Sequence, residues 1–261
     1  MQSSNRPVAL VTGASSGIGA ALARELARQG HDLVLSARSL APMEALAEEL
    51  RGLGAAATII PADLAERGAA AALVREIAAA GLEIEVLVNN GGLGAIGRFD
   101  RADPVRNAAI MQVNIIALTE LTRLLLPPML ARRRGKIVLV ASTASFLPCP
   151  NMAVYAASKA YVRSLGEALA QELDGSGVGV NVLCPGATET NFFDVAGGKL
   201  SRSQMRRMMS AEAVARIGIR GMARGKRVTV TGLANRILAF AATHAPHFLT
   251  LPVAQRSIGR D

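Results

Sequence analysis

Short uninterrupted apolar runs alternate with amphipathic helical patterns along most of the chain, and this alternation constrains the fold more than any other feature. Continuous apolar runs are typical of parallel strands that are buried on both faces. The sequence therefore predicts an α/β fold with a single Rossmann-type doubly wound parallel sheet of about seven strands and helices on both faces. Strands are predicted over residues 8–11, 32–36, 57–61, 86–88, 136–141, 179–183 and 228–230, and helices over 20–29, 42–53, 64–80, 112–132 and 152–173.

A glycine-rich turn follows the first predicted strand, with Gly13, Gly17 and Gly19 at its key positions. This spacing lets the backbone turn tightly and approach a pyrophosphate, and the following helix offers its free N–H groups to that phosphate. Ordinary turns also need glycine. The position between a strand and a helix is nevertheless the context of a dinucleotide-binding motif, so we predict a cofactor here.

The end of the second strand indicates which cofactor binds. NAD enzymes usually carry an acid here for the ribose 2′-hydroxyl. This chain has Ala37 instead, followed by Arg38, which can pair with a 2′-phosphate. We predict NADP(H); the alternative is an ordinary surface arginine. After the third strand, Asp63 either accepts a hydrogen bond from an adenine amino group or caps the helix predicted from Leu64.

Tyr155 and Lys159 stand four residues apart near the start of a predicted helix, so their side chains share one face. A nearby ammonium favours the phenolate and lowers the pKa of a tyrosine. Such a tyrosine can act as an acid or base near neutral pH. Ser142 ends the fifth strand and can polarise a carbonyl oxygen that Tyr155 protonates. Asn114 falls inside a predicted helix although asparagine is a poor helix former, so we expect its amide to hold a backbone kink or a water.

These motifs together resemble the short-chain dehydrogenase/reductase family, over about residues 7–190. The resemblance also rests on the Asn-Asn-Gly-Gly turn at residues 89–92 and the Pro-Gly turn at residues 185–186. It implies that Tyr155 is the acid in reduction and the base in oxidation, that Ser142 orients the substrate oxygen, and that Lys159 lowers the pKa of Tyr155 and holds the nicotinamide ribose. Asn114 would support a water that links Lys159 to solvent. The implied cofactor-binding residues are Gly13, Ser15, Ser16, Gly17, Ile18, Gly19, Arg38, Asp63, Leu64, Asn90, Gly91, Tyr155, Lys159, Pro185, Gly186, Thr188 and Thr190.

The segment after the Pro-Gly turn is expected to cover an apolar substrate. Met205, Met208 and Met209 follow helical spacing, so they either line an adaptable pocket or pack as an ordinary helix face. The expected substrate-lining residues are Phe146, Cys149, Phe192, Phe193, Met205 and Met209.

The chain has a formal net charge of +9, which by itself favours a nucleic-acid binder. Residues 1–190 carry 17 basic and 17 acidic side chains, whereas residues 191–261 carry 12 basic and 3 acidic ones. The charge therefore belongs to the C-terminal region and not to a recognised nucleic-acid fold, so we expect no nucleic acid. The basic helix predicted over residues 211–223 presents either a solvated face, a peripheral membrane contact or a site for a phosphate-bearing substrate. The uncharged run over residues 237–254 is expected to be interfacial or packed, not membrane-spanning.

The ending Thr231-Gly232-Leu233 departs from the family's usual Val-Asp-Gly-Gly, which puts the usual tetramer in doubt, although we still expect a homo-oligomer. The two cysteines show no metal spacing, the N-terminus has no apolar signal core, and we predict a cytoplasmic protein. We expect one domain, with a cofactor-binding and catalytic body at 1–190, a substrate lid and basic helix at 191–227, and a last strand and tail at 228–261. The expected function is hydride transfer between NADP(H) and a ketone or secondary alcohol on an apolar substrate. The alternative is a catalytically silent NADP(H)-binding regulatory or scaffold protein.

Overall fold

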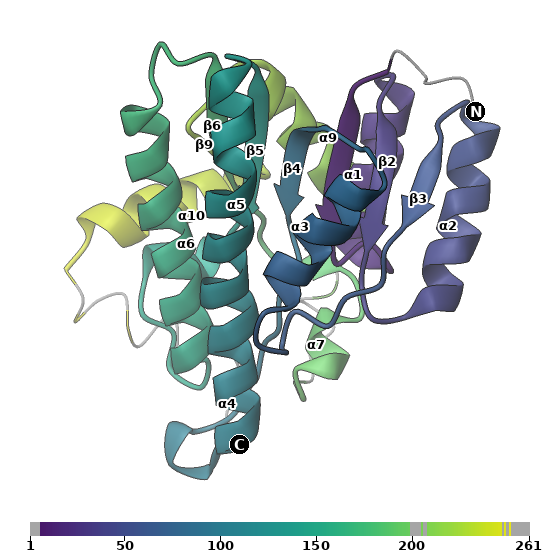
Figure 1. Cartoon of the computed structure of the whole chain (residues 1–261). Coiled ribbons are helices and arrows are strands. Elements are labelled where there is room, and N and C mark those ends of the chain that lie inside the picture. The colour runs from purple at the N-terminus through teal and green to yellow at the C-terminus, as the bar shows by residue number, and fades with distance from the viewer. Residues whose placement is uncertain (1–5, 199–204, 206–207, 247, 249–250, 252–261) are drawn as a thin grey trace.

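A computed structural model gives the fold, and it describes residues 6–198, 205, 208–246, 248 and 251. A seven-stranded sheet has the order β3-β2-β1-β4-β5-β6-β9, and every neighbouring pair of its strands is parallel (Figure 1). The predicted Rossmann-type α/β fold with about seven strands is therefore confirmed. The strands are β1 (Val8–Thr12), β2 (Asp32–Ser36), β3 (Ala57–Ile59), β4 (Ile84–Asn89), β5 (Gly135–Val140), β6 (Val178–Cys184) and β9 (Val228–Val230).

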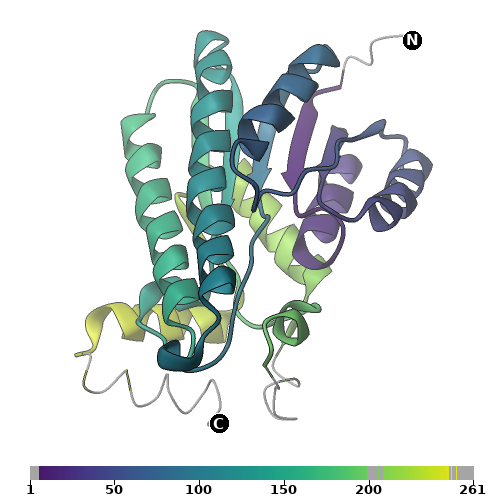
Figure 2. The ribbon, with the colours of Figure 1, turned by 60° about the horizontal axis from the view of Figure 1, so that its bottom comes forward.

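Helices cover both faces of this sheet, as Figures 1 and 2 show from two directions. One face packs against α1 (Gly17–Arg28), α2 (Leu40–Gly52) and α9 (Ala211–Ala223). The other packs against α3 (Ala69–Ala79), α5 (Leu118–Ala131) and α6 (Ala153–Glu172). Alternate strand residues belong to opposite cores: Val11 packs on the α1 side and Leu10 on the α3 side. Burial on both faces explains why the strands read as continuous apolar runs.

Two predicted helix starts are wrong. The helix expected from residue 64 begins at Ala69, because Gly68 adopts a left-handed conformation with φ +78° and interrupts the helical backbone. The helix expected from residue 20 begins at Gly17, inside the glycine motif.

The fourth predicted helix is a composite of three segments, and it starts earlier than the predicted residue 112. It runs through α4 (Pro104–Met111), a π-helical segment η2 (Gln112–Ala117) and α5. Asp103 caps its start by accepting a hydrogen bond from Val105 N at 2.9 Å, with Pro104 in the first turn. The expected irregularity at Asn114 is present as this π-helical segment. Within the described residues this helix, Pro104–Ala131, is the one with the length and apolarity of a membrane span, but core helices share both properties.

The segment after β6 contains β7 (Thr188–Glu189), α7 (Phe192–Val195), β8 (Met209–Ser210), α9 and α10 (Leu233–His244). Met209 pairs with Thr188 in a two-stranded sheet, so the helical spacing of the methionines does not correspond to a helix at that residue. The α9 prediction is confirmed over residues 211–223, with Ser210 Oγ accepting from Ala213 N at 3.2 Å. Within the uncharged run, Ile237 and Phe240 of α10 are 62% and 68% exposed, whereas Ala239 and Ala242 are buried, so only one side of this helix packs against the protein.

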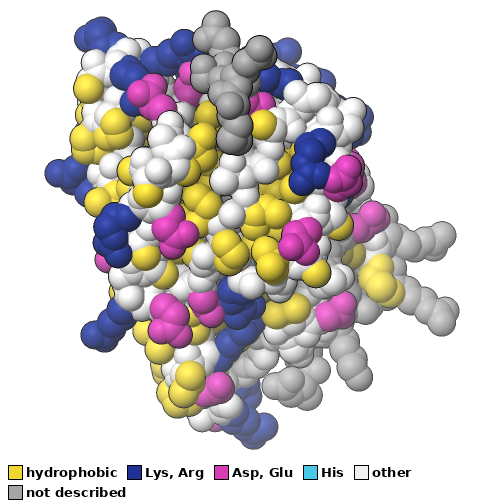
Figure 3. All heavy atoms as spheres, turned by 45° about the vertical axis from the view of Figure 1, so that its right-hand side comes forward, with side chains coloured by type: hydrophobic (Ala, Val, Ile, Leu, Met, Phe, Trp, Pro, Cys, Tyr) yellow, Lys and Arg dark blue, Asp and Glu magenta, His cyan; other side chains and the backbone are white. Residues whose placement is uncertain are grey.

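The surface of the N-terminal part carries mixed charge. Figure 3 shows the side of the molecule that carries α2, where basic and acidic side chains surround a more apolar centre. Charged side chains of α1 and α2 also pair, as Arg24 does with Glu49 at 2.8 Å between Nε and Oε1. This face agrees with the balanced charge of residues 1–190.

Candidate active site

A cavity of about 640 Å³ lies at the carboxyl ends of the strands, where ligands bind in open α/β sheets. Loops after β1, β2, β4, β5 and β6 all contribute to its wall. Each predicted cofactor-binding residue lines it except Gly19. Ser142, Tyr155 and Lys159 line the same cavity, whereas Asn114 lies behind it. The tertiary structure thus joins the two groups of residues that the sequence analysis separated.

The N-terminus of α1 opens into this cavity. Ser16 precedes the helix, and its side chain forms no capping hydrogen bond, so the first N–H groups of the helix remain available to an anion. Gly19 does not line the cavity but allows α1 to pack against the glycine-rich turn. A Cβ at this position would lie 2.2 Å from Gly13 O. Glycine is therefore required at this position so that the helix can lie close against the turn.

Thr12, for which the sequence predicts no role, connects β1 to the turn after β4. Its Oγ1 accepts hydrogen bonds from Asn90 N at 3.0 Å and Gly91 N at 2.9 Å. The Asn90 carboxamide returns the contact by donating to Thr12 O at 2.9 Å. These bonds hold the two cavity-lining turns together. In the sequence, the role of Thr12 is indicated only by its place at the end of a strand. No motif spacing distinguishes it from an ordinary buried residue.

The far end of the cavity fits a phosphate-bearing ribose. Arg38 is exposed there and has no carboxylate partner among the described residues. Ser36, 1% exposed, also lines the cavity, and its buried Oγ has no hydrogen-bond partner in the described part of the chain. A buried hydroxyl without a partner is destabilising, and a bound polar ligand can supply one. Asp63 Oδ1 accepts from Ala65 N at 3.0 Å, so it caps a turn there and not the start of α3.

Tyr155 and Ser142 meet at the opposite end. Ser142 Oγ accepts from Ala144 N at 3.1 Å, which leaves its O–H free to donate. Burial raises the pKa of Tyr155 to about 12, and a hydrogen bond with the Ser142 side chain lowers it in part. Tyr155 therefore keeps its proton at neutral pH. The ring of Phe192 packs against it, with 5.2 Å between ring centroids, and excludes water from this side.

Lys159 is buried beneath the tyrosine at 3% exposure, and its Nζ donates to Val140 O at 2.8 Å. The Nζ lies 5.8 Å from the centre of the Tyr155 ring. Burial lowers the pKa of Lys159 to about 8. Desolvation is the largest influence on the Tyr155 pKa and raises it, so the lowering of this pKa by Lys159 stays a prediction.

Asn114 clamps the loop after β4. Its Oδ1 accepts from Leu93 N at 2.8 Å, and its Nδ2 donates to Leu93 O at 2.9 Å and to Ser158 Oγ at 2.9 Å. Ser158 Oγ in turn donates to Tyr155 O at 2.7 Å. Fully buried Asn114 thereby links the loop to the helix that carries Tyr155 and Lys159. Ser158 had no predicted role, although it lies between the two catalytic candidates in the sequence.

Three of the six expected substrate-lining residues line the cavity: Cys149, Phe192 and Phe193. Phe146 packs against the core, with the Arg163 guanidinium 4.6 Å from its ring centre. Met209 packs against the α1-side core, and Met205 is 49% exposed outside the lining. Phe146, Met205 and Met209 thus lie outside the lining of this cavity in the described part of the chain, and their contact with a substrate stays a prediction. Ile96 and Met152 also line the cavity, although the sequence does not predict it. In the sequence, nothing distinguishes such apolar residues from ordinary core residues.

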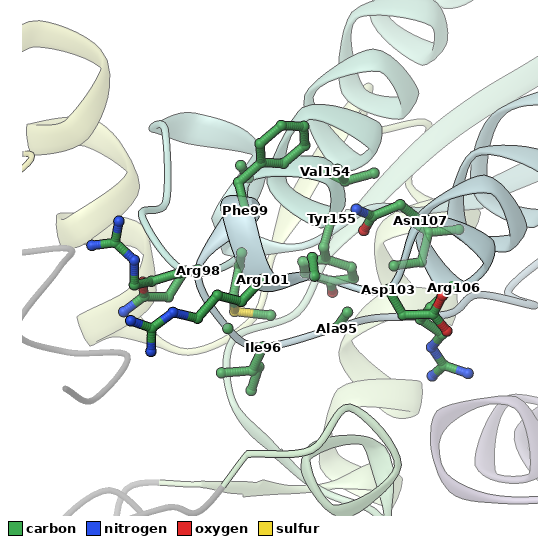
Figure 4. A pocket seen from close by; sticks show the side chains of 16 residues that line it. Ala95, Ile96, Arg98, Phe99, Arg101, Asp103, Arg106, Asn107, Val154 and Tyr155 are labelled. Atoms are coloured by element: carbon green, nitrogen blue, oxygen red, sulfur yellow. The ribbon is translucent and has the colours of Figure 1, made fainter. Parts of the chain in front are cut away.

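A second cavity of about 350 Å³ lies behind the loop after β4 (Figure 4). Figure 4 shows Tyr155 at its centre, between Arg98 and Arg101 on one side and Arg106 on the other. Arg106 donates to Gly94 O at 2.9 Å and to Val195 O at 3.3 Å. Arg106 thereby ties the loop to α7, which holds Phe192 over the tyrosine.

Comparisons with known proteins agree with this geometry. A family model described as short chain dehydrogenase matches residues 7–199. Oxidoreductase UcpA of Escherichia coli K12 is 38% identical over 185 residues, which cover 70% of this chain and 69% of that protein.

Three solved structures share the fold. A short-chain dehydrogenase from Sphingobium yanoikuyae in complex with NADPH is 34% identical, with a TM-score of 0.81 over 90% of this chain and 92% of that one. A bulky-bulky ketone specific alcohol dehydrogenase from Comamonas testosteroni is 31% identical, with a TM-score of 0.77 over 90% of each chain. A short-chain dehydrogenase/reductase from Burkholderia phymatum in complex with NAD is 26% identical, with a TM-score of 0.81 over 100% and 99%.

Proposed function

The chain belongs to the short-chain dehydrogenase family, and from this premise we propose that it is an NADP(H)-dependent oxidoreductase that interconverts an apolar ketone and its secondary alcohol. The observation that carries the proposal is the convergence of Tyr155, Ser142 and Lys159 on one cavity that also receives the N-terminus of α1. The bound nicotinamide would supply the hydride.

The protein's own residues would supply the proton and the orientation. Tyr155 donates its proton to the carbonyl oxygen during reduction, because its raised pKa of about 12 keeps it protonated at neutral pH. Ser142 would polarise the same oxygen by donating its O–H to it. Lys159 would hold the cofactor ribose with its ammonium group. Asn114 positions the loop beside Lys159, and we also assign to it the support of a water that leads from Lys159 to solvent.

The substrate class follows from the lining of the cavity near Tyr155. Cys149, Met152, Phe192 and Phe193 present an apolar surface there, which suits a bulky ketone better than a sugar. The named substrate class of the Comamonas testosteroni relative supports this assignment. A panel of ketones and alcohols, followed by the absorbance of NADPH, tests the proposal. No turnover with any member would contradict it and favour the alternative, a catalytically silent NADP(H)-binding regulatory or scaffold protein.

We expect Arg38→Ala to weaken NADPH binding by about 10- to 100-fold and to change NADH binding little, because one charge-assisted contact to the 2′-phosphate is lost. Dissociation constants for both cofactors, measured by fluorescence, check this. Arg51→Ala is the matched control, since Arg51 is an exposed arginine outside the cavity that pairs with Glu48. Equal weakening of NADPH and NADH in Arg38→Ala would rule out the phosphate contact.

The rate of ketone reduction should depend on pH through Lys159. Below its pKa of about 8 the ammonium is charged, and Tyr155 keeps its proton up to about pH 12. We therefore expect kcat/KM for reduction to be level at pH 6–7 and to fall by about tenfold per pH unit above 8. Lys159→Arg, which stays charged, should move this fall to higher pH. A wild-type profile that stays level to pH 10 would contradict the role of Lys159.

We further propose that the chain forms a homo-oligomer and works in the cytoplasm. The exposed side chains of Met111, Ile116 and Leu124, each 41–46% exposed, give helix Pro104–Ala131 a face that a second copy can cover. Light scattering should then give a mass of at least two chains.

We propose a peripheral membrane contact through the basic C-terminal region, where Arg236 lies among the exposed apolar residues of α10. Failure to float with phosphatidylserine vesicles at low salt would exclude that contact.

A further inference from the structure

The C-terminal helix α10 forms part of the wall of the large cavity. Asn235 and Leu238 line the cavity, although they lie beyond the residues that match the family model. The helix packs against η3 (Thr143–Phe146), the short segment directly after Ser142. Thr143 N donates to Pro185 O at 2.8 Å and joins that segment to the Pro-Gly turn. The wall therefore runs continuously from Ser142 through the turn to α10.

The Asn235 carboxamide is held in one orientation. Its Nδ2 donates to Thr231 O at 2.7 Å. It lies directly on Gly186, where an added Cβ would come within 2.3 Å of Nδ2 and 2.7 Å of Oδ1. Because the nitrogen is fixed by Thr231, the oxygen is the atom that remains available. Within the described part of the chain, no donor forms a hydrogen bond to Oδ1.

We propose that Asn235 is a specificity-determining residue whose Oδ1 accepts a hydrogen bond from a hydroxyl or amide N–H of the substrate, away from the reacting carbonyl. This inference rests on the proposed function. With its carbonyl oxygen at Ser142, a substrate can extend along the wall formed by η3 and α10 to Asn235. Leu238 borders the same wall with an apolar side chain. The favoured substrate is accordingly a bulky apolar ketone that carries one additional hydrogen-bond donor.

Benzophenone derivatives provide probes that separate a donor from mere bulk. The three monohydroxybenzophenones each carry a donor, and the corresponding methoxybenzophenones have similar shape without one. For the wild type we expect at least one hydroxy isomer to exceed its methoxy partner in kcat/KM by about tenfold, the range of a single hydrogen bond. In Asn235→Leu, which keeps the volume against Gly186 but has no acceptor, this ratio should fall to about one, mainly through KM.

Asn191→Ala is the matched control, because Asn191 is another asparagine that lines the cavity but lies just before α7 and not on α10. The hydroxy-to-methoxy ratio should survive in this variant. Thermal unfolding of Asn235→Leu shows whether α10 has stayed in place, and Asn235→Ala provides a second variant that also lacks the acceptor.

Isothermal titration calorimetry with the NADP⁺-loaded protein measures how tightly the hydroxy and methoxy compounds bind, without any turnover. Absence of a hydroxy preference in the wild type, or its persistence in both Asn235 variants, overturns the inference while leaving the oxidoreductase proposal intact. Weaker NADPH binding in Asn235→Leu would also overturn it, since Oδ1 would then serve the cofactor. If no ketone is reduced but the hydroxy preference appears in binding and is lost in the variants, the oxidoreductase proposal fails, and Oδ1 is established only as a ligand contact and not as a substrate contact.

Discussion

Replacing Tyr155 by phenylalanine should reduce kcat for ketone reduction by about 10²- to 10⁴-fold, the range that a positioned general acid contributes. The substitution removes only the hydroxyl and keeps the ring that packs against Phe192. It also deletes the hydrogen bond to the Ser142 side chain, so Ser142 alone remains to polarise the substrate oxygen. Stopped-flow or steady-state assays with a ketone that the wild type reduces provide the measurement.

NADPH affinity should stay within about threefold of the wild type in Tyr155→Phe, because the N-terminus of α1 and Arg38 are untouched. The chain has one other tyrosine, Tyr161, which makes a matched control. It is 37% exposed and its hydroxyl bonds to Thr119 Oγ1 at 2.9 Å, outside the cavity. Tyr161→Phe should leave turnover unchanged. Full activity in Tyr155→Phe would contradict the proposed role of Tyr155 as the general acid.

Asn114→Ala should lower the free energy of unfolding by about 2–5 kcal/mol, because it leaves several buried partners unsatisfied at once. Leu93 would lose both bonds of the clamp, and Ser158 Oγ would lose its donor. For a chain of this size, such a loss corresponds to a decrease of about 10 °C in Tm. Denaturant and thermal unfolding measure it.

The same substitution should also reduce activity. Gly92 lies between Asn114 and Lys159, since a Cβ on it would be 3.4 Å from Asn114 Oδ1 and 3.3 Å from Lys159 Nζ. A loosened loop would therefore no longer fix the surroundings of Lys159. Asn107→Ala is the control, because Asn107 lies on the same composite helix one heptad earlier, in the second cavity. If Asn114→Ala unfolds like the control, the clamp has no energetic role.

The π-helical segment at Asn114 shows that residue propensity can predict the presence of a helix irregularity but not the contacts that cause it. Asparagine within the predicted helix indicated an irregularity, because its side chain competes for backbone groups. Its real partner is the backbone of Leu93, 21 residues away. No spacing encodes that distance, because the contact depends on how the loop after β4 returns to the helix. Similarly, the methionine spacing suggested a helix face where Met209 in fact forms a strand with Thr188.

The pKa of Tyr155 is likewise set by tertiary contacts that the sequence spacing does not reveal. The i,i+4 spacing correctly predicted that Tyr155 and Lys159 share a helix, and Lys159 does lie near the ring. Spacing says nothing about desolvation, which depends on Phe192 and the loop that cover the tyrosine. That burial raises the pKa of Tyr155.

The sequence by itself determined the doubly wound sheet, the dinucleotide-binding turn, the Tyr155–Lys159 pair and the family, because each depends on local periodicity or on residues close together in the chain. Only the tertiary structure decided which apolar side chains face the cavity, how Asn114 is used, and that α10 reaches the Pro-Gly turn with Asn235. The physical reason is that burial and long-range contacts depend on the packing of distant segments, whereas periodicity reports only which face of an element is apolar.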